Sequence, residues 1–337
     1  MTTVYMWPKV NPENKFNELL SNSIEENGFR VEEFNKYMVK NMKNGDVLHM
    51  HWPSFHYEGK SLISTWLRCI KFVLFLLIIK KKGVKLFWTM HNLWPHKTGK
   101  CLHNKLMRRF LLKICNVIFI MSESMKIKIK ENFGKTYSNI VYVPHGSYKG
   151  VYPKRGIDIR KKFGIPENAY VYGFLGQVSP YKGIWDLIDN FNKLDDDSYL
   201  LIAGKLSKDI DENELRNITN NKTILDLRFI ENEEIVDYFN AFNSTVLPYK
   251  EITTSGTAVL ALSNAVPVVI PNIGLISDYV PHGCGVLYDP KKSDGLSNAL
   301  NTVKNIDQRV FLESQMKLME KLDWGYIGEL ICESYKK

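Results

Sequence analysis

Short apolar runs alternate with longer amphipathic stretches along most of the 337 residues. A run of four to six apolar residues that ends in polar or small residues is typical of a buried strand, and apolar spacing of three to four residues is typical of a helix. In the first half this pattern predicts strands at 4–6, 46–51, 85–90, 116–121 and 140–143, and helices at 14–27, 61–82, 103–115 and 122–132. Such a βα alternation predicts a parallel sheet.

The pattern restarts after a predicted linker at 148–154. It predicts strands at 170–175, 199–203, 223–229, 244–247, 267–270 and 286–288, and helices at 184–192, 213–219, 233–241, 256–264 and 295–303. The predicted fold class is therefore α/β, with two Rossmann-like, doubly wound parallel-sheet domains at 1–150 and 151–320. We expect the helix at 321–337 to pack back on the first domain. Because such sheets bind ligands at the carboxyl ends of their strands, we expect the domains to face across a cleft.

The helix at 61–82 has two interpretations. Its uninterrupted apolar part, 72–79, is too short to span a bilayer, and Lys80, Lys81 and Lys82 follow at once. An apolar face beside lysines is typical of a helix that lies in a membrane interface. A core helix with basic residues at its C-terminus fits the same pattern.

Charge divides the chain into a basic and an acidic half. Residues 1–150 hold 24 Lys and Arg against 10 Asp and Glu, whereas residues 151–337 hold 21 against 26. The basic half predicts contact with an anionic surface or substrate, although a merely solvated basic face has the same composition. A nucleic-acid-binding protein is disfavoured, because no recognised motif is present and aromatic residues do not interleave with the basic ones.

Cysteine usage predicts the compartment. The chain has five cysteines and no Cys-x-x-Cys pair, which indicates free thiols in the reducing cytoplasm. The histidines and cysteines also lack the ligand spacing of a zinc site, so we expect no metal.

Two segments in the second half predict a diphosphate site. The first, 174–183, and the second, 247–257, each join a strand through small residues to a helix N-terminus, where free amides bind anions. Lys182 adds a point charge, and the site would take an activated donor such as a sugar nucleotide. The expected donor-binding residues are Gln177, Lys182, Thr254, Ser255, Gly256 and Thr257, with Glu231 or Glu234 reaching the nucleoside.

Histidines gather near the predicted strand ends of the first half, where ligands bind. A histidine can accept a proton near neutral pH, so His91 is the first candidate for a general base, His51 the second and Glu58 a carboxylate reserve. Aromatic faces stack on sugars or acyl chains. The expected acceptor-binding residues are Asn11, Trp52, Trp94, His96 and His145. Structural histidines, and aromatic residues that only close the end of the sheet, are the alternative.

Five segments in chain order resemble one family. They are Asp46 to Pro53, Thr89 to His96, Pro144 to Tyr148, Pro180 to Gly183, and Leu247 to Lys250 with Ser255-Gly-Thr. Together they resemble the GT-B glycosyltransferases of family 94, which includes the β-1,4-mannosyltransferase of xanthan assembly.

The resemblance implies transfer of mannose from GDP-mannose, with inversion, to a polyprenyl-diphosphate-linked oligosaccharide in exopolysaccharide, capsule or O-antigen assembly. It implies a peripheral enzyme at the inner face of the cell membrane that needs no metal or other cofactor. Two alternatives stay open: a UDP-sugar-dependent GT-B enzyme, and a non-catalytic glycolipid-binding subunit. The second is motivated by Ile252 and Leu260, which stand where the retaining enzymes of family 4 carry glutamates.

Overall fold

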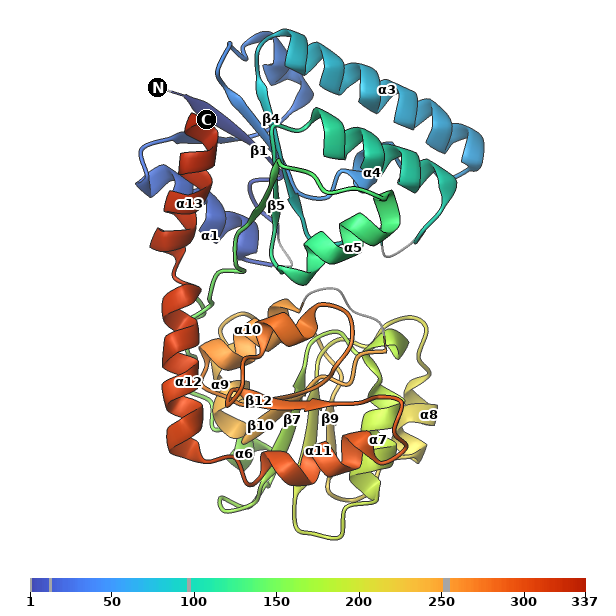
Figure 1. Ribbon diagram of the computed structural model, residues 1–337. Helices are drawn as coiled ribbons and strands as arrows, with labels where there is room; N and C mark the ends of the chain where they lie inside the picture. The colour runs from blue at the N-terminus through green and yellow to red at the C-terminus, as the bar shows by residue number, and fades with distance from the viewer. Residues whose placement is uncertain (1, 12–13, 96–97, 251–254) are drawn as a thin grey trace. The chain divides into compact units, whose positions relative to one another are not determined.

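The computed structural model describes residues 2–11, 14–95, 98–250 and 255–337, which fold into two compact units (Figure 1). Unit 1 comprises Met1–Gly146 and Leu322–Lys337, and unit 2 comprises Ser147–Lys321. These limits lie close to the expected boundaries at 150 and 320. Each unit is built on a six-stranded parallel sheet, so the predicted α/β class is confirmed.

The sheet of unit 1 has the strand order β2-β1-β3-β4-β5-β6, and every pair in it is parallel. Its central strands are almost wholly apolar because helices cover both faces. The strands are β1 (Thr3–Trp7), β2 (Arg30–Glu33), β3 (Val47–Met50), β4 (Lys85–Met90), β5 (Val117–Ile120) and β6 (Ile140–Tyr142).

Helices flank this sheet on both sides. In Figure 1, α3, α4 and α5 lie on one face, and α1 and α13 on the other. The helices of unit 1 are α1 (Phe16–Glu26), η1 (Lys36–Lys40), α2 (Ser54–Tyr57), α3 (Leu62–Lys81), α4 (Leu102–Ile114), α5 (Ser124–Phe133) and α13 (Trp324–Lys336). Helix α13 packs tightly on α1: a Cβ on Gly328 would lie 2.0 Å from Ser23 Oγ, which itself donates to the Trp324 carbonyl.

The sheet of unit 2 has the order β12-β11-β10-β7-β8-β9, again all parallel. Its strands are β7 (Val171–Leu175), β8 (Tyr199–Ala203), β9 (Thr223–Asp226), β10 (Ser244–Val246), β11 (Val268–Pro271) and β12 (Gly285–Tyr288). The chain adds β8 and β9 on one side of β7 and then adds β10, β11 and β12 on the other side, so the strand order reverses between β7 and β10. The loops that follow these two strands therefore flank the switch point, where doubly wound sheets bind ligands.

The helices of unit 2 follow the strands in alternation. They are α6 (Ile159–Lys162), η2 (Pro180–Lys182), α7 (Ile184–Asn192), α8 (Glu212–Asn217), α9 (Ile235–Ala241), α10 (Gly256–Ser263), η3 (Ile276–Tyr279), α11 (Gly295–Val303) and α12 (Gln308–Lys321). The apolar pattern did not predict β2 or α12. Strand β2 has only one buried residue, Val31, because it lies at the sheet edge and its other side chains meet solvent.

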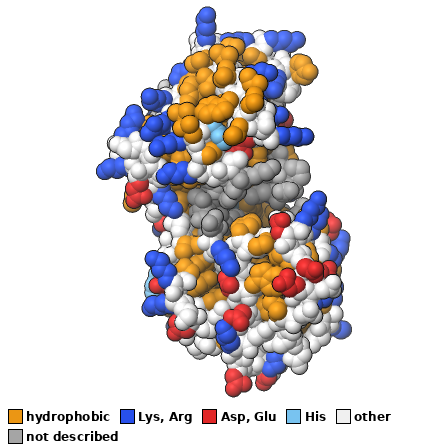
Figure 2. Space-filling model, turned by 90° about the vertical axis from the view of Figure 1, so that its right-hand side faces the viewer, with side chains coloured by type: hydrophobic (Ala, Val, Ile, Leu, Met, Phe, Trp, Pro, Cys, Tyr) orange, Lys and Arg blue, Asp and Glu red, His pale blue; other side chains and the backbone are white. Residues whose placement is uncertain are grey.

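Helix α3 leaves most of its apolar surface uncovered. A single stripe, including Cys69, Phe72 and Leu76, packs into the unit. Eight large apolar side chains outside this stripe are exposed: Leu62, Ile63, Trp66, Leu67, Ile70, Leu74, Leu77 and Ile78. Figure 2 shows orange side chains gathered on this face of unit 1, with Lys and Arg around them.

By length and composition alone, α3 could cross a membrane, and 28% of its most apolar 18-residue window is buried. The buried stripe holds the helix along the surface of unit 1, so α3 is part of this unit's packing. The core-helix interpretation therefore accounts for one stripe of α3, and leaves the exposed face without an explanation.

Candidate active site

Two histidines meet at the carboxyl edge of the first sheet. His51 follows β3 and His91 follows β4, and because these strands are paired neighbours the two side chains emerge side by side. His51 Nδ1 lies 3.1 Å from His91 Nε2. His51 is held further by its carbonyl oxygen, which accepts a hydrogen bond from Trp88 Nε1 at 3.3 Å. The sequence prediction named both residues, and the fold brings them into contact.

Burial keeps these histidines neutral. His51 and His91 are 1% and 8% exposed, and loss of solvent lowers the pKa of each well below its ordinary value, with the neighbouring histidines adding to the effect. Beneath them, burial lowers the pKa of His49 to about 3, and His49 is fixed between Tyr335 Oη and Thr89 Oγ1. A neutral imidazole has one unprotonated nitrogen, so the His51–His91 pair can accept a proton at neutral pH.

Aromatic rings orient the pair. The Trp52 ring stacks on His91 with a centroid distance of 4.3 Å and an interplanar angle of 17°. Phe16, at the start of α1, contacts His91 edge-on at 5.3 Å and also contacts His145. Sequence reasoning missed Phe16, whose only signal was its place at a predicted helix start next to a strand edge.

The histidine pair lines a cavity of about 500 Å³ within unit 1. Its lining is mainly aromatic and apolar, and it includes the side chains of Trp52, Phe55, Trp88 and Arg108. Glu58 also lines it and accepts a hydrogen bond from Thr98 Oγ1 at 2.5 Å. This volume is in the range of small-ligand sites, and the cavity therefore can hold a sugar against the histidines.

The other predicted acceptor residues are spread more widely. His145 is buried beside Phe16, and its Nδ1 lies 2.8 Å from the Gly146 carbonyl oxygen. Asn11 lies in the loop after β1 and bridges to Asn14. Trp94 packs on Phe133 of α5 and does not line the cavity. His96 lies outside the described residues.

In unit 2, Lys182 lies at the carboxyl end of β7. A Cβ built on Gly176, the first residue after β7, would lie 3.1 Å from Lys182 Nζ and 4.0 Å from Thr257 Oγ1. The ammonium, a glycine backbone and the first turn of α10 therefore converge at one point. Burial lowers the pKa of Lys182 to about 8, and among the described residues no carboxylate pairs with it. A phosphate would supply the missing negative charge.

The two loops that carry the diphosphate prediction are joined. Lys250 N donates to the Tyr181 carbonyl at 2.9 Å. Gly183 has φ +71°, and a Cβ there would lie 1.9 Å from the Pro248 carbonyl oxygen. Only glycine fits this close approach, which positions Lys182 against the start of α10.

Ser255 begins helix α10. Its Oγ accepts from Ala258 N at 3.1 Å and contacts Tyr249 Oη at 3.2 Å. Gly256 and Thr257 form the first turn, whose amides have no partner within the helix and suit an anion. Thr254 lies outside the described residues.

The remaining donor candidates differ in their freedom to bind. Gln177 is exposed just after Gly176, and Glu231 is exposed in the loop between β9 and α9. Glu234 is buried and accepts two hydrogen bonds from Arg228, at 2.7 and 2.8 Å, which lower the pKa of its carboxyl. Glu234 thus fixes this loop, and Glu231 is the carboxylate that remains available to a nucleoside.

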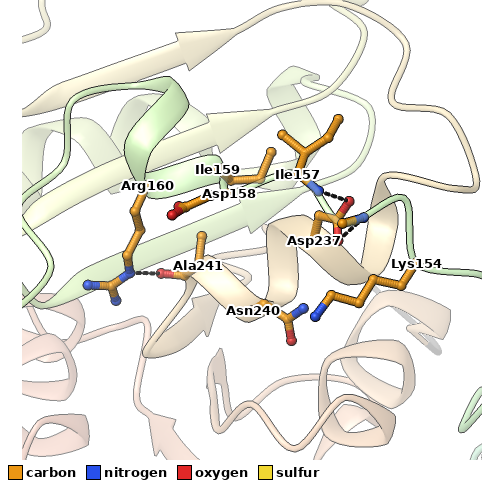
Figure 3. Close-up of a pocket in the computed structure, with 9 residues that line it drawn as sticks. Lys154, Ile157, Asp158, Ile159, Arg160, Asp237, Asn240 and Ala241 are labelled. Atoms are coloured by element: carbon orange, nitrogen blue, oxygen red, sulfur yellow. Dashed lines mark hydrogen bonds between the residues drawn. The ribbon is translucent and has the colours of Figure 1, made fainter.

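A hollow in unit 2, of about 290 Å³, has a structural explanation (Figure 3). Asp237 accepts from the backbone amides of Gly156 and Ile157, and Arg160 Nε donates to the Ala241 carbonyl. These bonds fasten the segment before α6 to α9. Because its Asp and Arg already bind backbone groups, the hollow offers little to a ligand.

Replacing Lys182 with alanine should weaken binding of nucleoside diphosphates by about ten- to a hundredfold, the value of a charge-assisted contact. Lys250→Ala is the matched control, because Lys250 lies in the adjoining loop and its ammonium forms an exposed ion pair with Asp186. Titration calorimetry measures both. Because the ammonium is charged below its pKa of about 8, wild-type affinity should also fall as pH rises through that value. Equal affinities of the two variants would refute the phosphate assignment.

Comparison with known proteins agrees with this geometry. Residues 157–321 match the family model described as "Glycosyl transferases group 1". The GDP-mannose:glycolipid 4-beta-D-mannosyltransferase of Xanthomonas campestris pv. campestris is 25% identical over 301 residues, which cover 86% of this chain and 79% of that protein. CapM of Staphylococcus aureus, a capsular polysaccharide biosynthesis glycosyltransferase, is 25% identical over 188 residues, which cover 53% of this chain and 49% of CapM.

Solved structures share the fold. HepE of Anabaena in complex with UDP superposes with a TM-score of 0.76 at 15% identity, and all of both chains is covered. Sucrose-phosphate synthase of Thermosynechococcus elongatus gives 0.75 at 13% identity and covers 100% of this chain and 98% of that one. The chain is thus a glycosyltransferase with the GT-B fold, in which residues 157–321 match the model of the group 1 glycosyl transferases.

Proposed function

We propose that this glycosyltransferase moves mannose from GDP-mannose, with inversion, onto a polyprenyl-diphosphate-linked oligosaccharide in the assembly of an exopolysaccharide, capsule or O-antigen. Unit 2 holds the donor and unit 1 the acceptor. The observation that carries the proposal is the desolvated His51–His91 pair beside a sugar-sized cavity. It is supported by a relative, aligned with 86% of this chain, that is named GDP-mannose:glycolipid 4-beta-D-mannosyltransferase.

The transfer follows from groups already described. The acceptor hydroxyl gives its proton to His91 as its oxygen bonds to C1 of the donor sugar. The C1–O bond to the nucleoside diphosphate breaks on the opposite side, so the configuration inverts. His91 can act through Nδ1 when its Nε2–H donates to His51 Nδ1, which orients the ring and spreads the positive charge that develops.

The leaving diphosphate needs positive charge as it departs. Lys182 and the first-turn amides of α10 supply that charge, so the reaction proceeds without a metal ion or other cofactor. An ammonium that burial has removed from water gains most when a dianion arrives, which favours binding at the moment the bond breaks.

The acceptor's lipid explains the exposed face of α3. Helix α3 has eight exposed apolar side chains, and Lys80 and Lys81 lie in its last turn. This combination fits a helix that lies in the interface of an anionic membrane. The enzyme would then work as a peripheral protein on the inner face of the cell membrane, where polyprenyl-linked glycans are reached from the cytoplasm.

A UDP-sugar is the second candidate donor. The HepE structures contain UDP and UDP-glucose, and they share the fold over the whole chain. A few contacts to the base and sugar separate one donor from another. The non-catalytic alternative is set aside, since the matched family and the curated relatives are transferases.

A thermal-shift titration with GDP, UDP and their hexose conjugates tests the donor. A ligand that binds only the folded chain raises its melting temperature by mass action, and we expect a rise with GDP and GDP-mannose at concentrations where UDP species give none. A rise with UDP species alone would replace mannose transfer by the second candidate.

Replacing His91 with alanine should lower transfer by about 10² to 10⁴-fold while nucleotide binding is retained, because a base acts only on the acceptor hydroxyl. Since burial lowers the pKa of His91 well below 6.5, wild-type kcat/KM for the acceptor, measured with saturating donor, should stay flat as pH falls from 7.5 to 6.5 and should decrease only at lower pH. His282→Ala, in unit 2, is the control. Wild-type turnover by His91→Ala would exclude His91 as the base.

Replacing both Leu67 and Leu74 with glutamate should abolish flotation with vesicles that contain phosphatidylglycerol. The two side chains are 55% and 54% exposed on α3, and burying carboxylates in the interface is unfavourable. Ile127→Glu, an exposed position on α5, controls for added negative charge. Undiminished flotation of the double variant would show that α3 is not the membrane-binding face.

A further inference from the structure

Arg108 is a buried cation that forms no ion pair with any residue that the structure describes. It lies on α4, is 3% exposed and lines the cavity of unit 1. Its Nε donates to the Leu93 carbonyl at 3.0 Å, and its guanidinium carbon lies 4.8 Å from the centre of the Trp88 ring. Its Nη1 is buried and has no hydrogen-bond partner, and no carboxylate within the described part of the chain forms an ion pair with it.

Such a group is costly unless something binds it. A guanidinium removed from water loses several kcal/mol of solvation, and proteins usually recover this with a carboxylate and several hydrogen bonds. Around the Arg108 guanidinium, the Leu93 carbonyl and the face of the Trp88 ring take the place of water. Glu58 lines the same cavity and its charge favours the charged guanidinium, but its carboxylate accepts a hydrogen bond from Thr98 and forms no salt bridge with Arg108. The unsatisfied Nη1 therefore indicates a ligand that is absent from the free protein.

We propose that this cavity is an oxyanion-binding subsite for the acceptor, in which Arg108 binds a phosphate or carboxylate group while Trp52 and Phe55 flank the adjoining sugar or isoprenoid. The inference rests on the proposed function in one respect, that unit 1 binds the acceptor. The shared chemistry is a flat or tetrahedral oxyanion, which arginine binds through two parallel N–H groups.

The rest of the lining supports an acceptor. His91 and His51 border the same cavity, and His51 Nε2 is a second buried nitrogen without a partner. Lys60 and Arg68 are exposed lining residues, and Arg68 lies on α3, the helix with the uncovered apolar face. A ligand anchored on Arg108 would thus reach the histidine pair at one side and α3 at the other. Arg108 would thus select acceptors that carry a phosphate or carboxylate group at this position.

The test compares Arg108→Met with Arg109→Met in the full chain. Both remove one positive charge from α4, but Arg109 is exposed. Three probes are titrated with the donor site saturated by nucleoside diphosphate: geranyl diphosphate, methyl glucuronide and neutral methyl glucoside. Arg108→Met should lower affinity for one anionic probe at least tenfold, and Arg109→Met should not. The probe that loses affinity identifies the oxyanion as a diphosphate or a sugar carboxylate.

Two further variants test anion binding if Arg108→Met does not fold. Arg108→Lys retains the charge and should retain measurable anion binding. Glu58→Gln removes a negative charge from the cavity and should tighten anion binding several-fold, since like charges no longer repel. Absence of any anion binding by the wild type, equal losses in the two methionine variants, or weaker binding by Glu58→Gln would overturn the subsite. Because no transfer is measured, failure of the proposed reaction leaves this test intact.

Discussion

Exclusion of water from the carboxyl edge of the first sheet is the constraint on which the catalytic proposal depends. His49, His51 and His91 are buried one above the other, and loss of solvent keeps all three neutral. The deepest ring is fixed by Tyr335, from the C-terminal helix α13, and by Thr89. Packing of the last helix on unit 1 therefore bears on the chemistry, because it holds the lowest histidine and through it the pair above.

In the proposed donor site of unit 2, two glycines allow backbone segments to approach closely. Gly183 rests against the Pro248 carbonyl, and Gly176 leaves space beside the Lys182 ammonium. A larger residue at position 183 would separate the loops after β7 and β10, and one at position 176 would crowd the Lys182 ammonium. The ammonium of Lys182 and the first turn of α10 are thereby presented together, which is the arrangement that a diphosphate requires.

Sequence reasoning predicted the strand–helix alternation because the strands buried on both faces are continuous apolar runs. It missed β2, whose Arg30-Val-Glu-Glu33 pattern reflects a solvated edge. It placed Lys182 after a strand of unit 2, and it placed His51 and His91 at the ends of two strands of unit 1 that the sheet pairs as neighbours, so that topology alone brings the two histidines together. It could not foresee that Arg228 occupies the Glu234 carboxylate, that Trp94 turns toward α5, or that Arg108 lies on the buried face of α4, because each depends on a side-chain direction.

The central claim is that His91 is a neutral base whose Nδ1 is free for the acceptor, and imidazole nitrogen chemical shifts measure this directly. NMR of the ¹⁵N-histidine-labelled protein at pH 7 should show His91 protonated on Nε2 alone, with that proton donated to His51 Nδ1. The state should persist as pH falls to about 6. A proton on Nδ1 of His91, or an imidazolium at pH 7, would contradict the account, because neither form can take the proton of an acceptor hydroxyl.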